Sequence, residues 1–115
     1  MAYDEILASR YRAALDGHVG ITEKKMMGGV CFFLDGNMIG GGRRHKDGIS
    51  RYMFRVGKDN EAEAMAREGA EVVEMGGRRM GGFIWVPEDA IQSDDVLSEW
   101  IALTLSFTVT LPAKQ

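Results

Sequence analysis

Residues 23–33, EKKMMGGVCFF, bring together lysines, paired glycines and the only cysteine of the chain, which are residue types that can bind phosphate or act as a nucleophile. Glycine-rich backbone beside a helix N-terminus can cradle an anion. A phosphate loop, however, leads from a strand into a helix and carries a GK[ST] sequence. Here the glycines precede an apolar, aromatic run, and GK[ST] occurs nowhere. The stretch therefore predicts the entrance to a buried strand, with glycines that permit a bulge or a close backbone approach.

The cysteine of this stretch, Cys31, lies between Val30 and Phe32. A nucleophilic thiol needs a base and an accessible, electropositive setting, but the two histidines, His18 and His45, fall in connecting segments. We therefore expect Cys31 to be a small, buried hydrophobic residue. One cysteine and two distant histidines also lack the spacing of a metal site. The sequence predicts no catalytic residue, no metal and no cofactor.

Basic residues make the strongest case for a binding function, because arginine suits phosphate and carboxylate groups. The candidates for binding an anion or a partner are Lys24, Lys25, Arg43, Arg44, Arg51, Arg55, Arg78 and Arg79. A nucleic-acid surface would also need aromatic rings between the charges, and strand alternation turns Tyr52 and Phe54 away from Arg51 and Arg55. Nucleic acid is therefore less favoured, and a small-molecule site in a cleft lined by glycine and arginine is a further alternative.

The composition predicts one globular domain over residues 1–115, because 45% of the residues are hydrophobic and 27% are charged. A single cysteine, no signal-like start and no long apolar run lead us to expect a soluble, cytoplasmic protein without a membrane segment. The net charge is −3, with 10 basic and 6 acidic residues in 1–58 against 4 and 11 in 59–115. We expect the two halves to interleave and largely neutralise one another.

Two helices are predicted in the first two thirds of the chain. Residues 4–17 combine a candidate N-cap, Asp4, with an apolar stripe and a terminal Gly17. Residues 59–69 form an alanine-rich helix, for which the spacing predicts that Ala62, Met65 and Ala66 face inward.

Five strands are predicted, within residues 26–34, 37–42, 49–57, 72–75 and 81–86. Asp35-Gly36 is a two-residue hairpin signal between the first two, and three consecutive glycines make the second of them weak or bulged. Residues 49–57 alternate most clearly, with Tyr52, Phe54 and Val56 toward the core and the other face toward water. Pro87 should end the last strand.

The C-terminal segment fits two patterns. A capping residue, Ser93, precedes a helical stripe from Leu97 to Leu111, whereas the residues from Ile101 onward also alternate between apolar and polar with period two. Threonines and Val109 favour a strand by propensity, and the capped start favours a helix.

Taken in order, MAYDEILASRYRAALDG, ITEKKMMGGVCFFLDGNM, MFRVG, GRRMGGFIWV and LSEWIALTLSFTVTLP resemble the N-terminal domain family of TfoX (Sxy), the bacterial competence regulator. The most specific blocks are E-x-K-K-M-x-G-G at 23–29, R-V-G at 55–57 and G-R-x-M-x-G at 77–82. The resemblance implies an α+β, two-layer fold similar to secretion-chaperone-like folds, in which helices pack on an antiparallel sheet of about five strands. It also implies a final helix to about Leu111.

The same resemblance implies a regulatory or protein-interaction domain linked to transcription or competence, with no catalytic residues. From the residues themselves we expect a homodimer, because the strands in 26–34 and 80–86 are apolar on both faces and a helical layer covers only one. A neighbouring loop could also cover the second apolar face, or a glycine bulge could reorient it.

Overall fold

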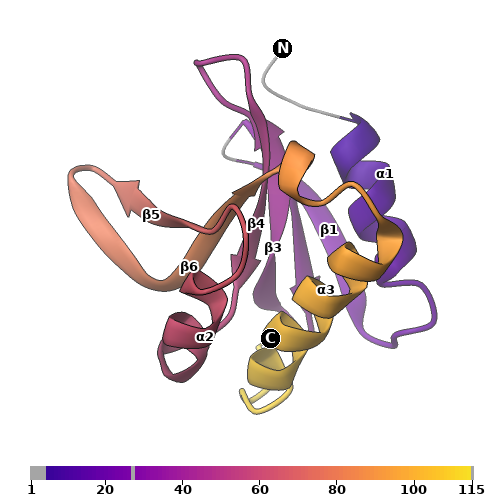
Figure 1. Ribbon diagram of the computed structural model, residues 1–115. Helices are drawn as coiled ribbons and strands as arrows, with labels where there is room; N and C mark the ends of the chain where they lie inside the picture. The colour runs from indigo at the N-terminus through magenta and orange to yellow at the C-terminus, as the bar shows by residue number, and fades with distance from the viewer. Residues whose placement is uncertain (1–4, 27, 115) are drawn as a thin grey trace.

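The computed structural model describes residues 5–26 and 28–114, so the predicted cap Asp4 lies outside the described residues. The described helices pack against one sheet (Figure 1). They are α1 (Glu5–Ala14), α2 (Glu61–Met65) and α3 (Asp94–Thr108), with the 3-10 turns η1 (Lys58–Asn60) and η2 (Glu88–Ala90). The strands of the sheet are β1 (Ile21–Met26), β2 (Gly29–Leu34), β3 (Asn37–Arg44), β4 (Ser50–Arg55), β5 (Glu71–Met75) and β6 (Arg78–Pro87). The α+β class that the sequence predicts is confirmed.

The sheet is antiparallel with the order β1-β2-β3-β4-β6-β5, so it has six strands where the sequence predicts five. The additional strand is β1, which pairs with β2 from Ile21 opposite Leu34 to Met26 opposite Gly29. Strands β1 and β2 therefore form a hairpin, and the strand predicted within 26–34 corresponds to β2, which begins at Gly29. Five of the six residues of β1 are exposed, which leaves no apolar alternation to reveal the strand.

The hairpin between β2 and β3 is confirmed at the predicted dipeptide. Asp35 and Gly36 have φ values of 49° and 83°, as a two-residue turn with both central residues at positive φ requires. The predicted bulge is also present, because the register between β2 and β3 shifts at Phe32 and Phe33. Strand β3 continues to Arg44, two residues beyond the prediction.

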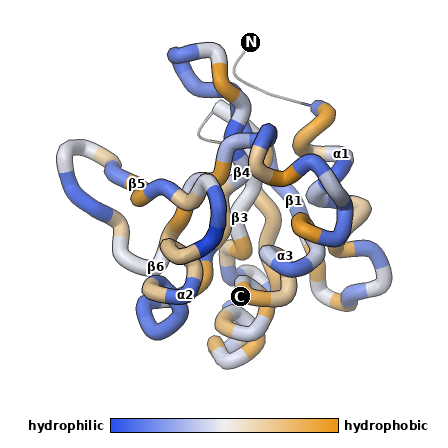
Figure 2. Tube along the Cα trace, in the orientation of Figure 1, coloured by the Kyte–Doolittle hydropathy of each residue, from blue (hydrophilic) through white to orange (hydrophobic). Residues whose placement is uncertain are grey.

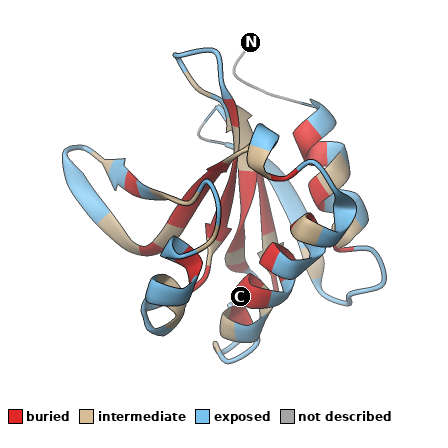
Figure 3. Cartoon of the chain, viewed as in Figure 1, coloured by how far each residue is buried: buried red, intermediate tan, exposed pale blue. Residues whose placement is uncertain are grey.

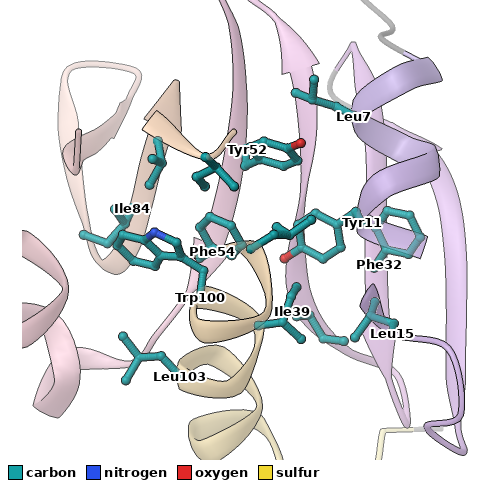
Figure 4. Packing of buried hydrophobic residues seen from close by; sticks show 14 of the residues in the cluster. Leu7, Tyr11, Leu15, Phe32, Ile39, Tyr52, Phe54, Ile84, Trp100 and Leu103 are labelled. Carbon is teal, nitrogen blue, oxygen red and sulfur yellow. The ribbon is translucent and has the colours of Figure 1, made fainter. Parts of the chain in front are cut away.

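The main core lies between the sheet and the helices (Figures 3 and 4). Tyr52, Phe54 and Val56 of the β4 region are fully buried there, as their alternation predicts. Aromatic rings stack across the layers, with centroids 4.8 Å apart for Tyr11 and Phe32 and 5.0 Å for Phe54 and Trp100. Such contacts fix α1 and α3 on the sheet because buried aromatic rings supply most of the apolar area.

Helix α2 differs from its prediction in length and in orientation. It spans five residues, and Ala64 is its buried residue, whereas Ala62, Met65 and Ala66 are exposed. Residues 58–60 form a 3-10 turn, which winds more tightly than an α-helix. Residues counted from position 59 at α-helical spacing are therefore predicted on the buried face of α2 but lie on its exposed face.

Helix α3 resolves the ambiguity of the C-terminal segment in favour of the helix. The Ser93 side chain accepts a hydrogen bond from the Val96 amide at 3.2 Å, as predicted for the cap. Thr108 Oγ1 donates to the carbonyl of Thr104 at 3.1 Å, which satisfies a β-branched polar residue inside a helix. The helix ends at Thr108, earlier than the expected Leu111.

Candidate functional site

The face of the sheet opposite the helices carries a second apolar cluster, and we call this face the open face. Met53, Val73 and Trp85 form the cluster and are 3%, 0% and 8% exposed; Met38, Met75, Met80 and Phe83 pack against it. The prediction that this side of β4 faces water was therefore wrong for Met53. Cross-strand pairing places Lys24, Cys31, Gly41, Met53, Trp85 and Glu71 in one row from β1 to β5.

Part of this cluster is covered by the end of the β5–β6 hairpin, residues 74–81, which we call the arm. The register of β6 shifts beside Gly82, which has a φ of 84°. The Val56 and Gly57 amides donate to the Gly82 carbonyl at 2.8 and 3.1 Å. Glu61 accepts from the Gly82 amide at 2.6 Å and from Arg79 at 2.8 Å. The R-V-G and G-R-x-M-x-G blocks thus meet and hold the arm at a glycine bulge.

Three of the predicted cations lie over aromatic rings of the open face, and Arg43, over Trp85, is one of them. Lys24 Nζ is 5.9 Å from the centre of the Phe33 ring. The Arg55 guanidinium is 5.7 Å from the Phe83 ring and 5.4 Å from Phe107 of α3. Among the residues that the structure describes, neither Lys24 nor Arg55 forms an ion pair.

Arg51 is the most constrained of the predicted cations. It donates to both carboxylate oxygens of Asp47, at 3.2 and 3.1 Å, and its Nε lies 3.3 Å from Glu71 Oε1 without the alignment of a hydrogen bond. The hydrogen bond from Arg51 lowers the pKa of Asp47. Since two carboxylates surround one guanidinium, Arg51 adds no net positive charge to the face.

A hollow of about 630 Å³ lies beside this ion pair, and Arg43, His45 and Trp85 line it with the arm residue Gly76. The His45 ring meets the Trp85 ring edge to face at 4.5 Å, and the Arg43 guanidinium lies 5.6 Å from that ring. Burial, followed by the charges of Arg43 and Arg51, lowers the pKa of His45, so the imidazole is neutral at pH 7.

The remaining predicted cations lie away from this hollow. Arg79 pairs with Glu61 at 2.8 Å, and Lys25, Arg44 and Arg78 are exposed on β1, β3 and the tip of the arm. The structure therefore gathers Arg43 and Arg51, which pair across β3 and β4, and leaves the other six separate.

Sequence reasoning gave no role to His45, Glu71 or Trp85, because strands distant in the chain bring them together. Hydrophilic residues dominate the tips of the two hairpins that flank the hollow (Figure 2).

Cys31 is 6% exposed, and burial raises the pKa of its thiol. The Cys31→Ala variant should lose about 1 kcal/mol of unfolding free energy, because the sulfur leaves a small void beside Met53 and Trp85. Chemical denaturation measures the loss. The native thiol should react with a labelling reagent far more slowly than the unfolded chain, and labelling within mixing time at neutral pH would contradict a packing role.

Among residues 5–26 and 28–114, no group of three or more His, Cys, Asp or Glu side chains could hold a metal ion. In the same described ranges, no helix is long and apolar enough to cross a membrane.

The fold and the open face define a small α+β domain with helices on one side of an antiparallel sheet and an aromatic, methionine-rich surface on the other. The family model of the TfoX N-terminal domain matches residues 13–108, and the chain belongs to this family of competence-regulator-like domains. No curated protein and no solved structure matches the chain significantly.

Proposed function

We propose that the chain is a non-catalytic regulatory domain that acts by binding protein through its open face, and that its first partner is a second copy of itself. The observation that carries this proposal is the second apolar cluster, because the described helices lie on the other side of the sheet and half-buried Met38 and Phe83 pack at its surface. Methionine side chains adapt well to a partner surface.

The row across the open face supports a two-fold pairing. It begins with exposed Lys24 on β1 and ends with Glu71 on β5, whose side chain is 44% exposed. A two-fold axis parallel to the strands reverses the strand order, so that Lys24 of one copy would lie opposite Glu71 of the other. Near the axis, Met53 would lie opposite Gly41. Opposite charges and a large residue over a small one are what a self-complementary interface requires.

Light scattering at micromolar concentration tests this pairing, with an expected mass of twice 12.7 kDa. Lys24→Glu and Glu71→Lys should each weaken the dimer by bringing like charges together, and the double variant should restore it. Asp16→Lys, an exposed change in the α1–β1 connection, should have no effect. A monomer mass at every concentration would contradict the dimer and leave the open face to another protein.

The regulatory role, with its link to transcription or competence, rests on membership of the family. A partner recovered from host extract by the wild-type chain, and lost with Lys24→Glu but not with Asp16→Lys, would support it. Recovery that does not depend on the open face would contradict the assignment of this surface.

Nucleic acid is the second candidate, because cations of the open face lie over Phe33, Phe83 and Trp85. Two observations favour protein: the net charge is −3, and the Trp85 ring is buried. A salt-sensitive gel shift with a single-stranded oligonucleotide would favour nucleic acid. A ligand-dependent thermal shift would instead favour a small molecule in the hollow beside Arg43 and Arg51.

A further inference from the structure

A second hollow, of about 680 Å³, lies on the helical side of the molecule between the end of α2 and α3, and we call it the helical groove. Val96, Trp100 and Leu103 form its apolar part, and Ala102 and Ser106 are small residues on the α3 side. Figure 1 shows α2 and α3 in front of the sheet, on the side opposite the open face.

Arg67 is the one cation among the described residues that line the helical groove. Its guanidinium lies 4.8 Å from the centre of the Trp100 ring and pairs with Glu63 at 3.2 Å. Arg67 therefore lines the groove with a charge that Glu63 balances, so it adds no net positive charge there.

Exposed carboxylates surround the helical groove. Glu68 and Glu99 line it, Asp95 lies one turn before Glu99 on α3, and Glu88 and Asp89 directly precede Ala90, which also lines it. Within the described part of the chain, none of these five carboxylates forms an ion pair. Unbalanced like charges repel one another, and a ligand of opposite charge would relieve that repulsion.

We propose that the helical groove binds a basic amphipathic segment of a partner protein. Lysine or arginine side chains of the segment would lie over Glu68 and Glu99, and its apolar side chains would contact Val96 and Leu103. Ala102 and Ser106 follow Glu99 on one face of α3, at spacings of three and seven residues, so a segment can approach this part of the helix closely. Charge excludes the opposite occupants, because an acidic peptide or a nucleic acid would meet carboxylates here. This proposal concerns a surface separate from the open face and stands independently of the proposed function.

Fluorescence anisotropy of a labelled, synthetic leucine–lysine amphipathic peptide tests the proposal on the full chain. The Glu68→Lys/Glu99→Lys double variant should weaken binding by about tenfold. The matched control is Asp16→Lys/Glu74→Lys, which changes the net charge equally at exposed positions outside the groove and should weaken binding much less. All four positions are exposed, so both variants should fold, and thermal melts verify this.

Trp100 locates the peptide. In a Trp85→Phe background Trp100 is the only tryptophan, and its fluorescence should change on addition of the leucine–lysine peptide. A lysine–serine peptide of equal charge should bind much more weakly, because it has no apolar side chains for the groove. Equal weakening by the two double variants, equal binding of the lysine–serine peptide, or tight binding of a leucine–glutamate peptide would each overturn the proposal. A dimer mass lost only with Glu68→Lys/Glu99→Lys would also overturn it, since the occupant would then be a second copy.

Discussion

Replacing Thr104 by proline is expected to unfold the domain. Thr104 lies in the middle of α3 and is fully buried, and its Oγ1 contacts the carbonyls of Ile39, at 3.0 Å, and of Arg55. Proline removes an amide hydrogen bond and clashes with the preceding turn, at a cost of about 3 kcal/mol or more. Loss of the hydroxyl removes a link between α3 and strands β3 and β4, which adds about 1 kcal/mol. A domain of this size has about 5–15 kcal/mol of stability in total.

The matched control for this change is Asp94→Pro. Asp94 is the first residue of α3, where the amide has no intrahelical partner and proline is tolerated. Circular dichroism should show a cooperative melt close to that of the wild type for Asp94→Pro and a loss of structure for Thr104→Pro. A folded Thr104→Pro variant would show that α3 contributes little to the stability of the sheet.

The parts of the fold that the sequence predicts correctly are those whose physical cause is local. Strand β4 alternates because one of its faces is fully buried under the helices, and the β2–β3 turn needs residues that accept positive φ. Strand β1 has almost no buried residue, so hydrophobic periodicity carries no signal for it. Its pairing depends on β2, which lies later in the chain.

The candidate site is less predictable, because it depends on which strands become neighbours. Arg43 and Arg51 could be chosen from their residue type, but their contacts with Trp85 and Glu71 require β6 and β5 to follow β4 in the sheet. No spacing in the sequence states that order. The glycine bulge at Gly82 could not be predicted for the same reason. Its hydrogen-bond partners, Val56, Gly57 and Glu61, lie far from it in the sequence.

Gly40 shows how much structural information a glycine run can hold. The sequence suggests that Gly40 to Gly42 leave little to pack, yet in the structure Gly40 lies between Phe32 and Phe54 with a φ of 150°. A Cβ at this position would overlap the carbonyl oxygen of Met53 and lie 2.5 Å from the Tyr11 hydroxyl. The Tyr11 hydroxyl itself donates to that carbonyl at 3.0 Å. Glycine thus leaves room for a buried tyrosine to reach β4.

The Gly40→Ala variant should therefore lose about 3 kcal/mol or more of unfolding free energy. Backbone strain at this φ contributes about 1–3 kcal/mol, and displacing the Tyr11 hydroxyl leaves a buried polar group without its partner, which costs about 1–3 kcal/mol. Gly48→Ala is the matched control, since Gly48 has a φ of 84° but open space around its Cβ position, and it should cost about 1–2 kcal/mol.

Urea denaturation of both variants, and of Gly40→Ala combined with Tyr11→Phe, separates the two causes. If the hydroxyl contact matters, the double variant loses less than the sum of the single losses, because removing the oxygen relieves one of the two close contacts of the methyl group. Equal losses for Gly40→Ala and Gly48→Ala would show that backbone conformation alone, and not the approach of Tyr11, requires glycine in this strand.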